Sequence, residues 1–170
     1  MTKEVCNMNI AFEPLSMQHQ TDVMTIFNHY ILTSTAAFPG KPLPDPFFAM
    51  ILKKSEGGYP AYAVRSDEKV VGFCQLSPYN PFSSFAGTAC VTYFLAPEYT
   101  GKGIGAECLR ILEENGKEMN ISHLIAEISS ENEASMYFHE KNGFRKVGEL
   151  TEIGSKLGRS FGIILMQKDI

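Results

Sequence analysis

Tryptophan is absent from this sequence, and its four cysteines show no C-x-x-C spacing. Such spacing is typical of zinc sites, and closely patterned cysteines are typical of disulfide frameworks. Three of the four lie among apolar residues, so we expect buried, reduced thiols in a cytoplasmic protein, with no metal site and no disulfide. The cysteines are Cys6, Cys74, Cys90 and Cys108.

An excess of positive charge is also lacking. Fifteen Lys and Arg residues stand against nineteen Asp and Glu residues, which gives a net charge of -4 and a pI near 5.6. This balance argues against a nucleic-acid partner, which would require a basic face. No apolar run approaches the ~20 residues of a membrane span, so we expect no membrane partner. The first residues, "MTKEVCNMNI", lack the apolar core of a signal peptide.

The composition favours one globular domain over residues 1–170. The length suffices for a sizeable core, and 44% of the residues are hydrophobic. Apolar alternation predicts strands, and apolar residues at helical spacing predict helices. The strands are expected at 8–13, 61–66, 69–77, 87–96, 122–129, 144–150 and 161–167, and the helices at 18–31, 47–54, 104–119 and 131–142. The mixture predicts an α/β or α+β fold with a βαβ unit in its second half.

A glycine-rich segment, "GKGIGA" at 101–106, precedes one of these helices. The first N–H groups of a helix lack intrahelical partners, and glycine lets the backbone approach an anion closely. The segment therefore predicts a pyrophosphate site, with Lys102 adding a nearby cation. A tight strand-to-helix turn without a ligand is the simpler alternative.

The same letters satisfy the dinucleotide fingerprint G-x-G-x-x-G/A, and Glu127 lies where a ribose-binding carboxylate would follow. Against this, residues 97–100 separate the strand from the loop. The remaining chain is also too short for the usual doubly wound half. A coenzyme A loop of an acetyltransferase is the other candidate.

The helix expected at 131–142 carries a second signal. Asn132, Ser135 and His139 share one face, because they are spaced at i, i+3 and i+7. That face is either a solvated side or a second wall of the phosphate site. Ala134, Tyr137 and Phe138 form the expected apolar face, and Ser130 with Glu133 is spaced as a capping box, with Gly143 as the stop.

The strings "FLAPEYTGKGIG" and "ENEASMYFHEKNGFRKVG" resemble the GNAT superfamily of acetyl-CoA-dependent N-acetyltransferases. Further strings resemble its phosphinothricin and methionine sulfoximine acetyltransferase group; they are "FNHYILTSTAAF", "GYP", "GSKLGRS" and "LMQ". The resemblance extends from about residue 8 to 168. It implies a mixed, strongly bent sheet whose fourth and fifth strands splay apart, about four helices, and a homodimer.

The resemblance also implies roles for residues. Acetyl-CoA would be the acetyl donor, with its pantetheine arm paired to backbone of the fourth strand and its pyrophosphate on the glycine loop. The implied coenzyme contacts are Tyr93, Phe94, Leu95, Thr100, Gly101, Lys102, Gly103, Ile104, Gly105, Ala106, Asn132 and Ser135. The implied acceptor contacts are Asn28, Thr88 and Thr92.

The chemistry requires a base for the amine, N–H donors for the developing oxyanion and an acid for the thiolate. In the resemblance, His139 is the candidate acid, and backbone near Phe94 or Leu95 supplies the oxyanion donors. Tyr137 lies on a different face of the helix and is expected in the core. Cys90 occupies the usual position of the basic glutamate, where a thiol with an ordinary pKa near ~8.5 is a poor substitute. His29 and an ordered water are alternative bases.

Other departures concern the acceptor. Ala86 stands where the group has an arginine suited to a substrate carboxylate, and Thr100, Ser160 and Gly162 also differ from the group's pattern. The leading prediction is an N-acetyltransferase of a small primary amine, an amino-acid-like compound being one candidate. Acetylation of a protein amine and a non-catalytic acetyl-CoA-binding module are the alternatives.

Overall fold

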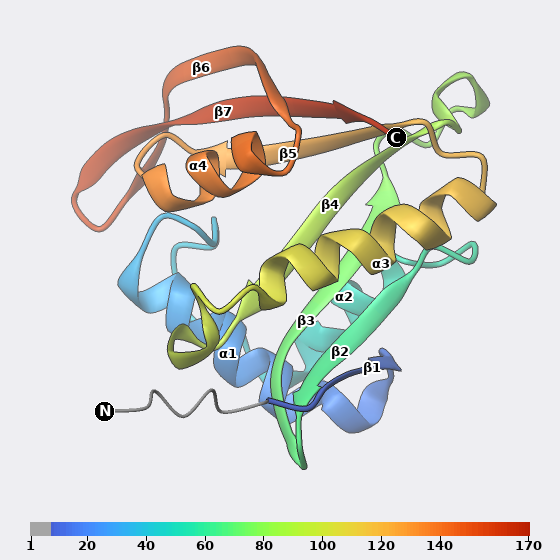
Figure 1. The fold of residues 1–170 in the computed structure, drawn as a ribbon. Helices are drawn as coiled ribbons and strands as arrows, with labels where there is room; N and C mark the ends of the chain where they lie inside the picture. Colours follow the sequence, from blue (N-terminus) through green and yellow to red (C-terminus); the bar gives the residue numbers. More distant parts are fainter. Residues whose placement is uncertain (1–7) are drawn as a thin grey trace, which may run out of the picture.

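The computed structural model describes residues 8–170, so Cys6 and most of the N-terminal stretch discussed above lie outside the described residues. Within residues 8–170, seven strands form one sheet (Figure 1). They are β1 (Ile10–Pro14), β2 (Ala61–Ser66), β3 (Lys69–Pro78), β4 (Thr88–Leu95), β5 (His123–Ser129), β6 (Arg145–Lys156) and β7 (Arg159–Asp169).

The strand order is β1-β2-β3-β4-β5-β7-β6. In the described part of the chain, β4 and β5 form the one parallel pair, and their pairing is confined to Thr88↔His123, Ala89↔Leu124 and Cys90↔Ile125. Beyond Cys90 and Ile125 the two strands separate. The predicted splay of the fourth and fifth strands is therefore confirmed, and it opens toward the carboxyl ends of both strands.

Four α-helices cover the sheet in the described residues. They are α1 (Gln20–Thr33), α2 (Phe48–Lys53), α3 (Ile104–Glu118) and α4 (Glu133–Lys141). Figure 1 shows α3 and α4 in front of the sheet and α1 and α2 behind it. Over residues 8–170, the structure contains no helix with the length and apolar character needed to cross a membrane.

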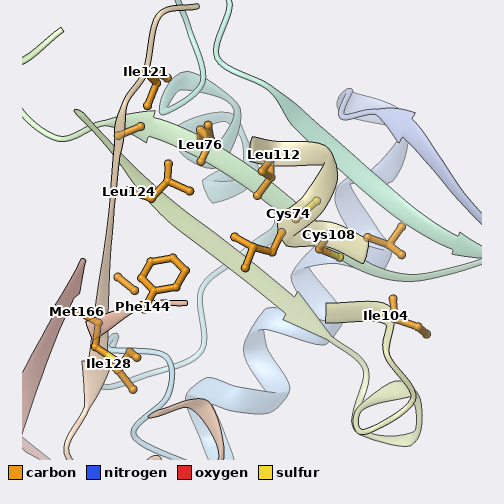
Figure 2. Packing of buried hydrophobic residues seen from close by; sticks show 14 of the residues in the cluster. Cys74, Leu76, Ile104, Cys108, Leu112, Ile121, Leu124, Ile128, Phe144 and Met166 are labelled. Atoms are coloured by element: carbon orange, nitrogen blue, oxygen red, sulfur yellow. The ribbon is translucent and has the colours of Figure 1, made fainter. Parts of the chain in front are cut away.

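Strand alternation divides the apolar side chains between two clusters. The larger cluster lies between the sheet and α3, where Cys108 and Leu112 of the helix face Cys74, Leu76 and Leu124 of the strands (Figure 2). The smaller cluster lies on the opposite face, where Val23 and Met24 of α1 meet Phe48 and Ile51 of α2 over Phe73. Both faces of β3 are thus covered, which is why its residues 70–76 are all buried.

The last hairpin is longer than the predicted strands at 144–150 and 161–167. β6 and β7 continue to a tight turn in which Leu157 and Gly158 both have positive φ, at 53° and 76°. This backbone suits the two-residue turns that join antiparallel strands. Alternation failed to predict the extension because the pairing shifts register between Leu150 and Gly154, where Glu152 also has positive φ.

The predicted capping box of α4 is wrong. Asn132 is the N-cap residue, and its side-chain oxygen accepts a hydrogen bond from the Ser135 N–H at 3.1 Å. The Ser130 hydroxyl instead accepts from the Gly162 N–H at 2.9 Å, which ties the β5–α4 turn to β7. The helix therefore begins later than the predicted cap implied.

Candidate active site

A cleft of about 1290 Å³ follows the gap between β4 and β5. Its walls come from both layers of helices and from β3, β4 and β5. Because β4 and β5 are parallel, the helices that follow them begin at the open end of the gap, where ligands gather in such sheets. The cleft therefore runs from the N-termini of α3 and α4 to the closed end at Cys90 and Ile125.

The glycine loop forms the open end of the cleft. Gly101 and Gly103 have φ of 70° and 86°, a backbone conformation that a side chain disfavours, and Gly103 is the N-cap of α3. Ala106 donates its N–H to Gly103, whereas Ile104 and Gly105 occupy the first helical positions, whose N–H groups have no intrahelical acceptor. The loop thus presents backbone donors and the positive end of a helix dipole toward an anion.

The loop residues take different positions around these donors. Thr100, Gly101, Gly103, Gly105 and Ala106 line the cleft. The Ile104 side chain is buried in the core instead, and the Lys102 ammonium lies 5.4 Å from the ring centre of Tyr99.

A Cβ on Gly105 would lie 3.3 Å from the Phe138 ring of α4, so this glycine permits the close approach of α3 and α4. The two helix N-termini therefore border one site.

The exposed edge of β4 faces the gap. Ala96 donates to Val71 of β3, and backbone groups alternate in direction along a strand, so Phe94 pairs toward β3 while Tyr93 and Leu95 turn toward β5. The Tyr30 hydroxyl donates to the Leu95 carbonyl at 2.6 Å, in agreement with this direction. Phe94 is therefore corrected as a source of backbone donors, and the Leu95 and Tyr93 N–H groups remain.

His139 and Tyr93 form a hydrogen-bonded pair on the α3/α4 side of the gap. His139 is only 3% exposed, its ring stacks on Tyr93 at 5.5 Å between centres, and its Nε2 is hydrogen-bonded to the Tyr93 hydroxyl. Its Nδ1 lies 2.7 Å from the Ser135 carbonyl oxygen, which can only accept. The neutral ring consequently carries its proton on Nδ1, and Nε2 accepts from Tyr93.

Burial keeps both members of this pair neutral. It lowers the pKa of His139 below its ordinary value, against an opposing effect of the Ser135 carbonyl. It also raises the pKa of Tyr93 well above its ordinary value. Near pH 7 a neutral phenol therefore donates to a neutral imidazole, and His139 alone has no Nε2 proton to give.

The expected faces of α4 are partly reversed. Tyr137, expected in the core, is 62% exposed, and Ala134 is also exposed. His139, from the expected polar stripe, is buried, although Asn132, Ser135 and His139 all line the cleft. The helix turns a polar side inward because the cleft, and not the apolar core, lies beneath it.

A loop to which the sequence analysis gave no role forms another wall. Residues 36–39 line the cleft, and the buried Lys156 ammonium of β6 donates to the carbonyls of Ser34 and Ala37 at 2.7 and 2.6 Å. The Thr35 hydroxyl is 2.6 Å from that of Ser129 at the end of β5. These bonds fix the loop against strands that are distant in sequence, which explains why no local sequence pattern predicted the position of the loop.

Cys90 lies at the closed end of the gap, and its thiol is protonated at neutral pH. Burial raises its pKa to about 11, Glu127 adds to this increase, and Lys54 opposes it. A thiol with this pKa holds its proton too tightly to act as a base near pH 7. The two charged neighbours both line the cleft. The sequence analysis considered Glu127 only as a ribose contact and did not consider Lys54, because the two residues come from different elements.

The three predicted acceptor contacts separate in the structure. Thr92 lines the cleft, but Thr88 lies on the paired part of β4, outside the lining. The Asn28 amide is engaged with Leu43, donating to its carbonyl and accepting from its N–H, both at 2.8 Å. Asn28 thereby anchors the 39–47 loop, and exposed His29 does not line the cleft either.

The comparison with protein families identifies this arrangement. The model of the acetyltransferase (GNAT) family matches residues 23–144, most of the chain. The chain belongs to the GNAT acetyltransferase family. A relative from Alcaligenes faecalis, named phosphinothricin N-acetyltransferase, is 30% identical over 150 residues, covering 87% of this chain and 76% of the relative.

Two further proteins are similar to this chain. A protein of Pseudomonas aeruginosa named L-methionine sulfoximine/L-methionine sulfone acetyltransferase is 28% identical over 151 residues, 87% of each chain. The solved structure of a phosphinothricin acetyltransferase from Sinorhizobium meliloti, in complex with acetyl-CoA, superposes with a TM-score of 0.89 at 22% identity, over 96% of this chain and 89% of that one.

Family membership decides between the two phosphate-binding interpretations. The GNAT sheet is mixed and mainly antiparallel, whereas a dinucleotide fold requires a doubly wound parallel sheet. The dinucleotide-binding alternative is therefore wrong, and the chain is an N-acetyltransferase of the GNAT family.

Proposed function

We propose that this enzyme transfers an acetyl group from acetyl-CoA to the primary amine of a small, amino-acid-like molecule. The observation that carries the proposal is the gap between β4 and β5, which connects free backbone donors at the α3 N-terminus with a polar pocket at its closed end. One domain, built on the single sheet, carries both ends of this cleft.

The residues at the cleft fit acetyl-CoA along its length. The positive-φ glycines and free N–H groups of the loop suit a pyrophosphate, and the gap-facing backbone of Tyr93 and Leu95 suits the amides of a pantetheine arm. Asn132 and Ser135 add polar contacts from α4. With the phosphates at the open end, the thioester lies toward the closed end, where it supplies the activated acetyl group.

Different groups of the chain then have different roles in acetyl transfer. The Leu95 N–H is placed to stabilise negative charge on the acetyl oxygen. The Tyr93 hydroxyl donates its single proton to His139 Nε2, and burial raises its pKa well above the ordinary value. The bonded pair therefore has no proton to give to the thiolate, which takes the proton that the acceptor amine loses when it is acetylated. The lowered pKa of His139 agrees with this, because a neutral imidazole near pH 7 accepts at Nε2 and has no proton there to give.

The named substrates of the relatives support the acceptor class. Phosphinothricin and methionine sulfone, from the names of the two relatives above, are amino-acid-like compounds. The acceptor half of the cleft in this chain is lined by polar and aromatic side chains, which suit a compound of this class.

Calorimetry with acetyl-CoA and a thiol-release assay with small amines test the proposal. We expect binding in the micromolar range and turnover on at least one amino-acid-like amine. Binding without turnover on amino acids, polyamines or aminoglycosides would favour the non-catalytic module, and no binding at millimolar acetyl-CoA would refute both.

A glycine variant tests the loop assignment. Gly103→Val places a branched side chain at positive φ in the loop and should weaken acetyl-CoA binding by about tenfold or more. Gly58→Val is the matched control, because Gly58 has a similar φ of 89° and open space around it but lies outside the cleft lining. Equal affinity of the two folded variants would contradict the loop's role.

The proposal includes a homodimer formed through β6. Within residues 8–170, β6 is the last strand of the sheet. Three apolar side chains of β6 are exposed, Val147, Leu150 and Ile153, and Leu157 is exposed in the turn that follows. A long edge strand with apolar side chains is a surface that a second copy commonly covers.

The proposed compartment is the cytoplasm. The three cysteines in the described residues, Cys74, Cys90 and Cys108, are free thiols, which suits a reducing environment. Fractionation of the native host with an antibody to the protein tests this assignment.

A further inference from the structure

The acceptor half of the cleft has a polar floor on the α1/α2 side of the sheet. Gln75 of β3 and Thr92 of β4 are direct cross-strand partners, and both line the cleft. Gln75 is 1% exposed and its side-chain oxygen accepts from the Ser55 hydroxyl at 3.3 Å. Its amide nitrogen can donate a hydrogen bond to a ligand in the cleft.

A carboxylate stands across the gap from this floor. The parallel register ends at Cys90↔Ile125, and continuing it by two residues places Glu127 opposite Thr92 on the same face. The Glu127 side chain is exposed and lines the cleft, although its backbone pairs with Leu165 of β7 on the other side of β5. This is the closed end of the gap, where the thioester lies in the proposed function.

An ammonium group completes the arrangement. Lys54 follows the last residue of α2 and lines the same cleft. Lys54 and Glu127 both act on the Cys90 thiol, one lowering its pKa and the other raising it, so both charges lie near the closed end. The position that the resemblance assigns to a basic glutamate is therefore flanked by one cation and one anion.

Apolar side chains lie beside these charges. Phe27 packs edge-on against Phe94 at 5.1 Å between ring centres, and both line the cleft with Phe47 and Ile51. A ligand that spans Lys54 and Glu127 thus meets an aromatic wall formed by α1, α2 and β4.

We infer that Lys54 and Glu127 recognise the two charges of an α-amino acid acceptor with an apolar side chain. Lys54 binds the acceptor carboxylate in place of the absent arginine at position 86, and Glu127 binds the ammonium group and takes one of its protons. This inference rests on the proposed function and names the residues that select its substrate. The Gln75–Thr92 floor adds hydrogen bonds between the two charges.

The step balances without another reagent. One proton passes from the ammonium group to Glu127 and then to solvent. The amine nitrogen bonds to the acetyl carbon, the carbon–sulfur bond breaks, and the second proton lost by nitrogen ends on the thiolate. The products are the N-acetyl amino acid, free coenzyme A and one proton.

Lys54→Met tests the carboxylate contact. In the thiol-release assay with a panel of L-α-amino acids, this variant should raise the KM for the best acceptor about tenfold and leave its kcat within twofold. The methyl ester of that amino acid, which lacks the carboxylate charge, should show no such increase. Lys53→Met is the matched control, because neighbouring Lys53 is exposed and does not line the cleft.

Glu127→Gln tests the proton transfer. We expect kcat to fall about a hundredfold at pH 7 and to recover as the pH approaches the pKa of the acceptor amine, while acetyl-CoA affinity stays unchanged. Glu118→Gln, which removes an exposed carboxylate at the far end of α3, should show the wild-type pH profile.

The possible outcomes separate the two levels of the argument. Failure of the wild type to bind acetyl-CoA would refute the proposed function itself. Acetyl-CoA binding with turnover only on amines that lack a carboxylate would overturn this inference and the amino-acid-like acceptor class, and leave acetyl transfer to a small amine intact. Wild-type KM in Lys54→Met, or a wild-type pH profile in Glu127→Gln, would overturn the corresponding contact.

Discussion

Cys90 occupies the usual position of a catalytic base in the sequence pattern, but its chemistry does not suit that role. Its thiol has a pKa of about 11, chiefly because it is buried, so it remains protonated at the pH where the enzyme works. Cys90→Ala should therefore change kcat less than threefold, whereas a thiolate base would make the same variant nearly inactive. Steady-state kinetics from pH 6 to 9 measure this, and an activity loss of a hundredfold would restore Cys90 as the base.

His139 provides a test based on pH. Burial lowers its folded-state pKa below the ordinary value of 6.5, so the unfolded chain binds more protons at this residue between the folded value and 6.5. Its contribution to stability is full above pH 6.5 and is lost as the pH falls below that value. Urea unfolding at pH 7.5 and 5 should show a smaller acid loss for His139→Gln than for the wild type.

The control for this experiment is His29→Gln, because His29 is exposed on α1 and does not line the cleft. It should retain the wild-type loss of stability on acidification. An identical pH dependence in His139→Gln and the wild type would contradict a buried neutral imidazole.

At the scale of elements, the N-terminus of α4 combines stability with ligand binding. Asn132 caps the helix through the Ser135 N–H and also lines the cleft. Asn132→Ala should reduce the free energy of unfolding by about 1 kcal/mol, since the cap is lost. Chemical denaturation measures this, and Asn132→Ser should restore most of the stability because serine also caps helices.

The same two variants separate the two roles of Asn132. If the Asn132 amide contacts the coenzyme, Asn132→Ser should recover the stability but not the acetyl-CoA affinity. Recovery of both would limit Asn132 to capping, and loss of stability in both variants would contradict the capping assignment.

The sequence predicted the positions of the helices and strands well, but it did not predict which side of α4 is buried. Strand and helix positions followed from alternation and helical spacing, because most elements pack one apolar side against the sheet. On α4 this rule placed Tyr137 inside and left His139 open to either interpretation, but the helix covers a polar cleft, so His139 is buried and Tyr137 is exposed. Functional sites are where such conflicts between pattern and burial are expected.

The acceptor site escaped sequence reasoning for a different reason. Lys54 and Glu127 lie on separate elements, and only the separation of β4 from β5 brings both charges to one cleft. The glycine loop could be recognised because its residues are consecutive and its chemistry depends on backbone. The coenzyme half was therefore more predictable than the acceptor half, whose residues depend on tertiary structure.

At the scale of the whole molecule, the exposed edge of the sheet argues for a second copy. β6 covers twelve residues at the end of the strand order, and Ile153 is 60% exposed on it. Covering such a surface would remove apolar area from water and protect an edge that otherwise favours uncontrolled strand pairing. Ile153→Lys would place a charge in this interface, where its desolvation opposes association.

Light scattering coupled to size-exclusion chromatography should therefore find a homodimer for the wild type and a shift toward monomer for Ile153→Lys. Phe82→Lys is the matched control, because Phe82 is even more exposed but lies between β3 and β4, away from β6. It should remain dimeric. Since the Lys156 ammonium of the same strand fixes the loop that forms one wall of the cleft, loss of the dimer should also weaken acceptor binding more than acetyl-CoA binding. A wild type that is monomeric at micromolar concentration, or equal behaviour of the two variants, would contradict an interface at β6.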